Sequence, residues 1–131
     1  MGPLMVDVAG LTLTTLEKEM IDSPFVGGLI LFARNFQSIE QLKKLVAQIR
    51  AVSQEIIIAV DHEGGRVQRF KEGFTRVPAM GTFGKLYLDD KDAANVLAKD
   101  TAWLIASELI ACDIDISFAP VLDRDIGVSS V

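Results

Sequence analysis

The fold is decided by residues 56–70, which read IIIAVDHEGGRVQRF. The stretch opens with a continuously apolar run, Ile56–Val60, and a dense polar cluster follows it directly. Continuously apolar strands have both faces buried, as in a parallel sheet that is covered by helices. The run Gly28–Phe32 has the same character, and Leu4–Val8 and Ile114–Val121 are further apolar runs. We predict a strand at each of these positions.

Helix signals lie between the predicted strands. Thr14 and Glu17 have the spacing of a capping box and predict a helix that runs to about Ile21. Ser38 and Gln41 form a second box of the same kind. The apolar residues that follow this second box at helical intervals are Leu42, Leu45, Val46 and Ile49. The sequence therefore predicts compact strand–helix units over its first half.

A third helix is predicted after the acidic stretch 89–92, because negative charge stabilises a helix N-terminus. Its predicted buried face is made of apolar pairs that repeat every seven residues, namely Val96/Leu97, Trp103/Leu104 and Ile110/Ala111. Trp103 is expected to pack rather than to bind a ligand, and the single Cys112 to be a small buried hydrophobe. Between strand and helix, residues 62–92 form a long predicted loop, whose composition fits an ordered site loop at least as well as a flexible linker.

The composition excludes several classes of protein. The chain has 131 residues, is 50% hydrophobic and carries 13 basic against 18 acidic side chains, a net charge of −5. Such a chain folds, and its charge opposes binding to nucleic acid or to anionic membranes. No apolar run approaches the roughly 18 residues of a membrane span, and the N-terminus lacks signal-peptide character. We expect a cytoplasmic protein.

The polar cluster is the candidate site. Asp61 follows a strand directly, where parallel α/β proteins bind ligands, and its carboxylate can accept from adjacent sugar hydroxyls. The glycines at 64–65 permit a sharp turn and close approach to a ligand, and Arg69 offers forked donors. Alternatively, this segment is an ion-paired turn in which Asp61 and Glu63 neutralise Arg66 and Arg69. Residues alone leave both interpretations open.

Other polar residues carry weaker signals. His62 is the only histidine, so we predict no metal and no cofactor, and we expect His62 to be a loop residue with a local hydrogen bond. Asp7 and Asp123 follow the first and last predicted strands and would share an edge with Asp61. The three carboxylates suggest a polar rim, although Asp7 and Asp123 are more typical of structural turn residues.

At these residues the chain resembles the bacterial cytoplasmic β-N-acetylhexosaminidases of glycoside hydrolase family 3. The most specific match is Asp-x-Glu-Gly-Gly-Arg-Val-x-Arg, which occupies residues 61–69. The other matching segments are MGPL at 1–4 with DV at 7–8, GGLILFARN at 27–35 and FAPVLD at 118–123.

The resemblance implies a (β/α)8 barrel of roughly 250 residues. Residues 1–131 would be the N-terminal portion of one catalytic barrel, about three and a half βα units, truncated after the fourth strand. The resemblance also implies that the complete protein releases terminal β-linked N-acetylglucosamine from cell-wall muropeptides during peptidoglycan recycling. The only partner it implies is a carbohydrate. Asp61 and Arg69 match substrate-binding residues of the family. The complete protein is expected to be a monomer, whereas the fragment could self-associate through unpaired strand edges.

The resemblance also implies a retaining mechanism with an aspartate nucleophile and a histidine acid/base. Both are expected downstream of residue 131, so residues 1–131 alone are expected to hold no catalytic residue and no activity. Alternatives are a β-glucosidase of the same family, a non-catalytic sugar-binding module, or a small flavodoxin-like domain. Sequential strand order would favour the barrel, and order 2-1-3-4 the flavodoxin-like domain.

Overall fold

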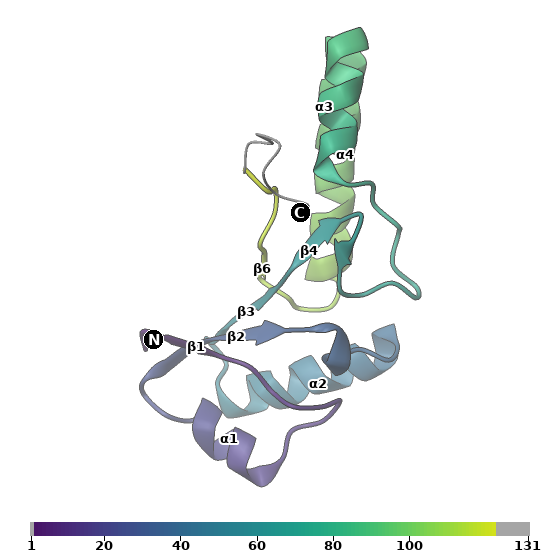
Figure 1. The fold of residues 1–131 in the computed structure, drawn as a ribbon. Coiled ribbons are helices and arrows are strands. Elements are labelled where there is room, and N and C mark those ends of the chain that lie inside the picture. Colours follow the sequence, from purple (N-terminus) through teal and green to yellow (C-terminus); the bar gives the residue numbers. More distant parts are fainter. Residues whose placement is uncertain (1, 123–131) are drawn as a thin grey trace.

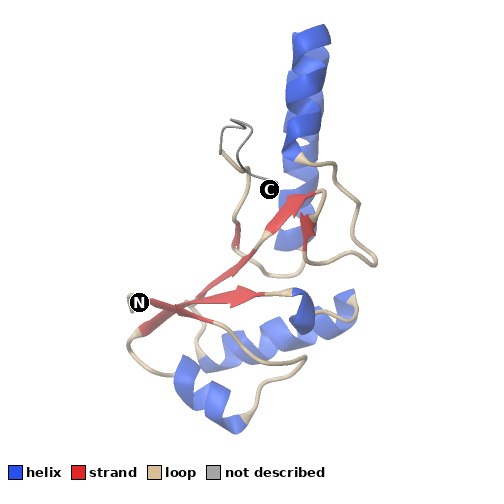
Figure 2. Cartoon of the chain, in the orientation of Figure 1, coloured by secondary structure: helices blue, strands red, loops and turns tan. Residues whose placement is uncertain are grey.

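The computed structural model describes residues 2–122, so Asp123 lies outside the described residues. Strands β1 (Leu4–Val6), β2 (Val26–Leu31), β3 (Ile57–Val60) and β6 (Ile116–Ser117) pair in parallel, in the order β1-β2-β3-β6 (Figures 1 and 2). This sequential order is the one predicted for a barrel arc. The order expected of a flavodoxin-like domain is wrong for these strands.

The strand boundaries differ from the predicted runs. Leu4–Val8 is a strand only to Val6, and Ile114–Val121 only over Ile116–Ser117, which pair with Ala59 and Val60. The second strand begins earlier than predicted, at Val26, because that residue pairs with Leu4. The two central strands, β2 and β3, are almost wholly buried, as their continuous apolar character predicted.

The first helices begin at the predicted caps. Helix α1 (Thr15–Ile21) has the complete capping box, in which Thr14 and Glu17 bond reciprocally. Helix α2 (Ile39–Val52) is capped by Ser38, whose hydroxyl accepts from the Gln41 amide. The second half of this predicted box is wrong, because the Gln41 side chain accepts from the Gln37 amide instead. The side-chain nitrogen of Gln41 donates to the carbonyls of Leu11 and Asn35. These bonds hold the Gln41 side chain away from the Ser38 amide.

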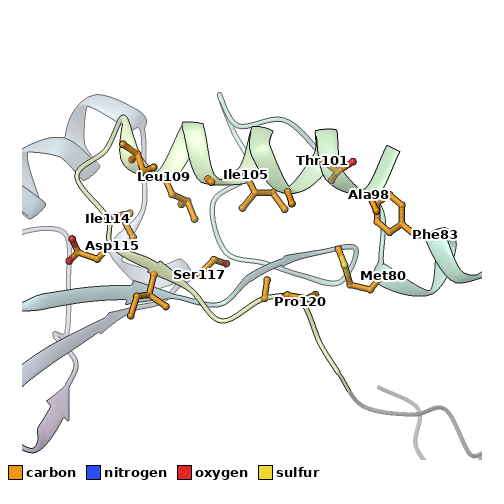
Figure 3. Close-up of a pocket in the computed structure, with 15 residues that line it drawn as sticks. Met80, Phe83, Ala98, Thr101, Ile105, Leu109, Ile114, Asp115, Ser117 and Pro120 are labelled. Carbon is orange, nitrogen blue, oxygen red and sulfur yellow. The ribbon is translucent and has the colours of Figure 1, made fainter. Parts of the chain in front are cut away.

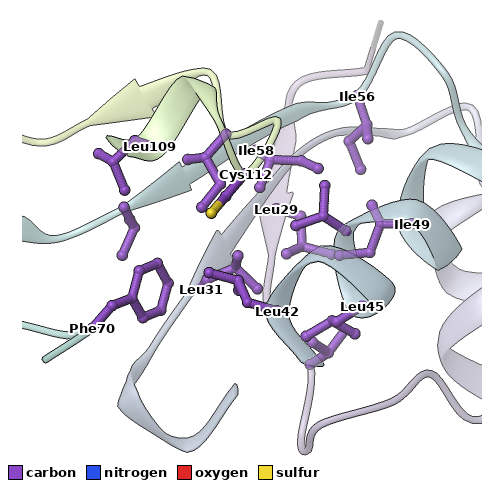
Figure 4. Close-up of a cluster of buried hydrophobic side chains, with 14 of the residues drawn as sticks. Leu29, Leu31, Leu42, Leu45, Ile49, Ile56, Ile58, Phe70, Leu109 and Cys112 are labelled. Atoms are coloured by element: carbon purple, nitrogen blue, oxygen red, sulfur yellow. The ribbon is translucent and has the colours of Figure 1, made fainter. Parts of the chain in front are cut away.

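The core lies between the sheet and α2. The α2 residues predicted to face inward, Leu42, Leu45, Val46 and Ile49, are all buried. They pack with buried residues of the central strands such as Leu29, Leu31 and Ile58, and Cys112 is buried in the same cluster, as predicted (Figure 4). Each fully buried Leu or Ile contributes about 1.5–3 kcal/mol. This packing holds the strand ends in place.

The long predicted loop contains regular structure. Strands β4 (His62–Gly64) and β5 (Val67–Gln68) form an antiparallel hairpin, and α3 (Met80–Asp89) precedes α4 (Lys91–Ile110). Helices α3 and α4 lie side by side and extend away from the sheet (Figure 1). Helix α3 was not predicted because it contains two glycines, which disfavour helix. The acidic N-terminus of α4 is confirmed, since Asp90 caps it by accepting from the Ala93 amide.

The predicted buried face of α4 is wrong. Val96, Trp103 and Ile110 are 60%, 71% and 69% exposed among the described residues, whereas Ala94, Ile105 and Leu109 are buried. Apolar residues occur all round this helix, which packs against both α3 and β6. The seven-residue repeat therefore identified one apolar face of the helix, but it did not show which face is buried against the rest of the protein.

Candidate functional site

The candidate site lies at the carboxyl end of β3. Leu31 pairs with Val60, and Val60 with Ser117, so Phe32 and Asp61 leave β2 and β3 at the same level. This edge is where parallel α/β proteins bind ligands. Side chains alternate along an extended chain, so Asp61 points to the opposite face from Val60, which is fully buried in the core with the helices. Asp61 therefore faces away from the helices.

The β4–β5 hairpin brings the Arg69 side chain next to that of Asp61. Arg69 Nη2 lies 2.8 Å from Asp61 Oδ2, and the two side chains are 31% and 23% exposed. Of the ion pairs in the ion-paired-turn interpretation, this is the one that forms among residues 2–122. Glu63 and Arg66 pair with neither partner there. The pair leaves Asp61 Oδ1 without a donor from the described residues, so it can accept from a ligand.

The glycines of the hairpin serve the chain itself. Gly64 and Gly65 have φ of +97° and +59°, and a Cβ on Gly64 would lie 2.5 Å from the Pro78 carbonyl oxygen. The Gly65 amide donates to the Val77 carbonyl over 2.7 Å. The sharp turn was predicted correctly, and both glycines lie closely against residues 77–79. The glycines thus fix the hairpin that carries Arg69.

Gln68 and Glu108 are supporting residues that sequence reasoning missed. Gln68 is 2% exposed, donates to the Phe70 and Thr75 carbonyls and accepts from the Val77 amide. Glu108, on α4, accepts from the Thr75 amide and hydroxyl. Both side chains fix the loop that follows Arg69. No pattern in the sequence pointed to Gln68, which lies beside Arg69 in the polar cluster, or to Glu108.

The prediction for His62 is wrong. His62 lies in β4, is fully buried, and neither ring nitrogen has a hydrogen-bond partner among the described residues. Its ring packs 5.6 Å from that of Phe70 and 5.5 Å from that of Phe74, between centroids. Alternation puts it on the opposite face from Asp61, which is the core side. Burial lowers the pKa of His62, and the Glu108 carboxylate opposes this shift only in part.

Asp7 forms a second ion pair at the rim. Asp7 Oδ2 lies 3.1 Å from Nη2 of Arg34, which belongs to the short helix η1 (Ala33–Asn35) after β2. Asp7 thus has the structural partner that a turn residue would have, and it also follows β1 at the edge that carries Asp61. The proposed rim of three carboxylates reduces to Asp7 and Asp61 here, because Asp123 is outside the described residues.

The structure also contains an apolar cavity of about 370 Å³, and Figure 3 shows the side chains that line it. It is formed between α4 and the segment around β6, with Phe83, Ile105 and Leu109 among its lining residues. Neither Asp61 nor Arg69 lines it. The Asp61–Arg69 pair and the apolar cavity are therefore two separate features of the structure.

Residues 2–122 contain neither a membrane-spanning helix nor a cluster of metal ligands. No helix in this range combines the length and apolarity needed to cross a membrane. No group of three or more His, Cys, Asp or Glu side chains in this range could hold a metal ion.

A sequential parallel α/β sheet with a carboxylate–arginine pair at its carboxyl edge is the arrangement of a polar-ligand-binding α/β domain. Residues 4–127 match the glycosyl hydrolase family 3 N terminal domain, and the chain belongs to this family. The family resemblance of the motifs is thereby confirmed.

Relatives cover the whole chain. It is 56% identical over 134 aligned residues to a protein named beta-hexosaminidase from Neisseria meningitidis serogroup A, covering 99% of the chain and 37% of the relative. The identity to the beta-hexosaminidase of Methylobacillus flagellatus is 55%, covering 100% of the chain and 38% of the relative. The chain thus spans little more than a third of the length of the curated relatives it matches.

Solved structures agree. NagZ from Neisseria gonorrhoeae in complex with N-trifluoroacetyl-D-glucosamine superposes with a TM-score of 0.93 at 55% identity, covering 96% of this chain and 38% of that one. A glycoside hydrolase family 3 β-N-acetylglucosaminidase from Paenibacillus matches with a TM-score of 0.76 at 34% identity, covering 88% and 22%.

Proposed function

We propose that the full-length protein hydrolyses terminal β-linked N-acetylhexosamine, and that residues 1–131 form the N-terminal portion of its single (β/α)8 barrel. One observation carries this proposal: the Asp61–Arg69 pair stands at the strand edge of a family 3 chain. The names of the relatives, beta-hexosaminidase among them, support the reaction. The glucosamine derivative bound by the Neisseria gonorrhoeae protein supports the sugar.

Asp61 and Arg69 have complementary roles in this proposal. The ionised Asp61 carboxylate accepts hydrogen bonds from hydroxyls of the terminal sugar, using the oxygen that Arg69 leaves free. Arg69 keeps the carboxylate oriented and offers its remaining donors to the same sugar. These contacts accelerate hydrolysis to the extent that they strengthen as the ring flattens toward the oxocarbenium-like transition state.

The bond-breaking groups are proposed to lie outside residues 1–131. A retaining mechanism needs a carboxylate nucleophile and an acid/base group, which we assign to an aspartate and a histidine further along the full-length chain. The substrate we propose is N-acetylglucosamine at the non-reducing end of peptidoglycan fragments, handled in the cytoplasm. Residues 1–131 supply part of the sugar-binding rim and position it through the core beneath β3.

The test is a substitution in the full-length protein. Asp61→Asn keeps the shape of the side chain but removes the charge that makes its hydrogen bonds strong. We expect kcat/KM on an aryl β-N-acetylglucosaminide to fall roughly 10- to 150-fold, the equivalent of about 1.5–3 kcal/mol. Asp100→Asn, an exposed carboxylate on α4, is the matched control and should hydrolyse at the wild-type rate.

The outcomes separate the parts of the proposal. Wild-type kinetics in Asp61→Asn, with native circular dichroism, would refute the role of Asp61. A wild-type protein that cleaves aryl β-glucosides but not the N-acetylglucosaminide would refute the sugar. Because both substrates release the same phenol, the comparison isolates recognition of the terminal residue.

A further inference from the structure

Two arginines share one aromatic ring at the strand edge. The guanidinium carbon of Arg34 lies 4.6 Å from the centroid of the Phe32 ring, and that of Arg69 lies 5.7 Å from the same centroid. Phe32 directly follows β2 and is half-buried. Phe32 therefore connects the Asp61–Arg69 pair to the Asp7–Arg34 pair along this edge.

Arg34 is held more firmly than its exposure suggests. Its side chain is 45% exposed, yet Nη2 contacts Asp7 at 3.1 Å, Nε donates to the Val8 carbonyl over 3.1 Å, and the guanidinium stacks on Phe32. An exposed arginine free of such contacts samples many rotamers. A side chain fixed before a ligand arrives binds it with less loss of entropy.

A structural role alone does not account for this arrangement. The loop after β1 is already tied to η1 by Asn35, which is fully buried and donates to the Val8 and Gly10 carbonyls over 2.9 Å each. An exposed ion pair such as Asp7–Arg34 adds little stability to that anchor. No acceptor among residues 2–122 bonds Nη1 of Arg34, so the donors of this nitrogen are available to a ligand.

The Asp61–Arg69 ion pair is more buried than the Asp7–Arg34 ion pair. The side chains of Asp7 and Arg34 are 53% and 45% exposed, against 23% and 31% for Asp61 and Arg69. An enzyme that removes a terminal sugar encloses that sugar and leaves the rest of the substrate nearer to solvent. The more enclosed pair therefore suits the terminal residue, and the more exposed pair suits the portion beyond the scissile bond.

We propose that Arg34, stacked on Phe32 and held by Asp7, binds the leaving-group portion of the substrate. This inference rests on the proposed hydrolysis of terminal N-acetylhexosamine. The ligand would be a sugar whose hydroxyl or carboxylate oxygens accept from the Arg34 guanidinium, while its apolar face packs on the Phe32 ring. Arg34 would thus set specificity for the group that is released, whereas Asp61 and Arg69 recognise the sugar that is cleaved off.

The experiment compares two substrates that differ only in the leaving group. Full-length wild type and Arg34→Gln are assayed on an aryl β-N-acetylglucosaminide and on the disaccharide of N-acetylglucosamine and N-acetylmuramic acid. We expect the loss of kcat/KM on the disaccharide to exceed the loss on the aryl substrate by about tenfold or more, mainly through KM. Lys44→Gln breaks another exposed ion pair, with Glu40 at 2.7 Å, and should leave the ratio of the two substrates unchanged.

Equal losses on both substrates, or no loss on either, would overturn the inference while leaving the proposed function intact. A wild-type protein that cleaves neither substrate would overturn both. Should Arg34→Gln fail to fold, Arg34→Lys retains the charge opposite Asp7 but loses the planar fork. The same ratio measured on Arg34→Lys then decides, with a selective loss on the disaccharide in support and an unchanged ratio against.

Discussion

Replacing Gly64 with alanine tests how the hairpin is built. Gly64 has φ of +97°, a region in which a residue with a Cβ is strained by about 1–3 kcal/mol. The new methyl group would also meet the Pro78 carbonyl oxygen at 2.5 Å and Val77 Cγ1 at 3.0 Å. Residues 77–78 would have to move, which weakens the bond from the Gly65 amide to the Val77 carbonyl by about 1 kcal/mol. Together these effects predict a loss of about 2–4 kcal/mol.

The assay is urea unfolding of the full-length protein, followed by far-UV circular dichroism. The midpoint should fall in Gly64→Ala with the slope unchanged, because the same surface is exposed on unfolding. Gly84→Ala is the matched control: Gly84 lies in α3, and a Cβ there meets nothing within 4 Å. Alanine should stabilise that helix by about 0.5–1 kcal/mol. Equal midpoints for Gly64→Ala and wild type would refute the strain argument, as would an equal loss in both variants.

Three further predictions concern His62, Glu108 and Cys112. His62 has a lowered pKa in the folded state, so stability should be constant above its ordinary pKa of 6.5 and decline as the pH falls below it; His62→Leu should flatten this profile in urea titrations. Glu108→Gln replaces the charged acceptor of the Thr75 amide and hydroxyl and should lower the free energy of unfolding by about 1–2 kcal/mol in thermal unfolding. A smaller loss would contradict the role of Glu108 in fixing the loop. Burial raises the pKa of the Cys112 thiol, which should react with a disulfide reagent only on unfolding; rapid labelling of the native protein would contradict its burial.

The sequence predicts correctly those features that depend on interactions between residues close together in the chain. The caps at Thr14 and Ser38, the apolar face of α2 and the buried central strands all follow from neighbouring residues. The face of α4 could not be obtained in this way, since its partners, α3 and β6, come from elsewhere in the chain. Helix α3 was hidden by Gly81 and Gly84, whose propensity opposes helix, whereas packing against α4 supports it.

In the candidate site, too, some features could be predicted from the sequence and others required the tertiary structure. The strand end at Val60 and the motif that follows it located Asp61 and Arg69, and the pairing of these two side chains required the hairpin. The sequence predicts a loop position for His62, because a polar residue among polar neighbours is typical of a loop. Its burial against Phe70 and Phe74 depends on aromatic residues that the hairpin and the following loop bring back.

The sequence by itself determined the family, the parallel strands and the edge on which the polar cluster lies, because each depends on short-range order along the chain. Only the tertiary structure decided which charges pair, which face of α4 is buried and that His62 belongs to the core. It also placed Arg34 and Arg69 on one aromatic ring. These are contacts between residues distant in sequence, and their geometry depends on strand register and helix packing, which no local pattern encodes.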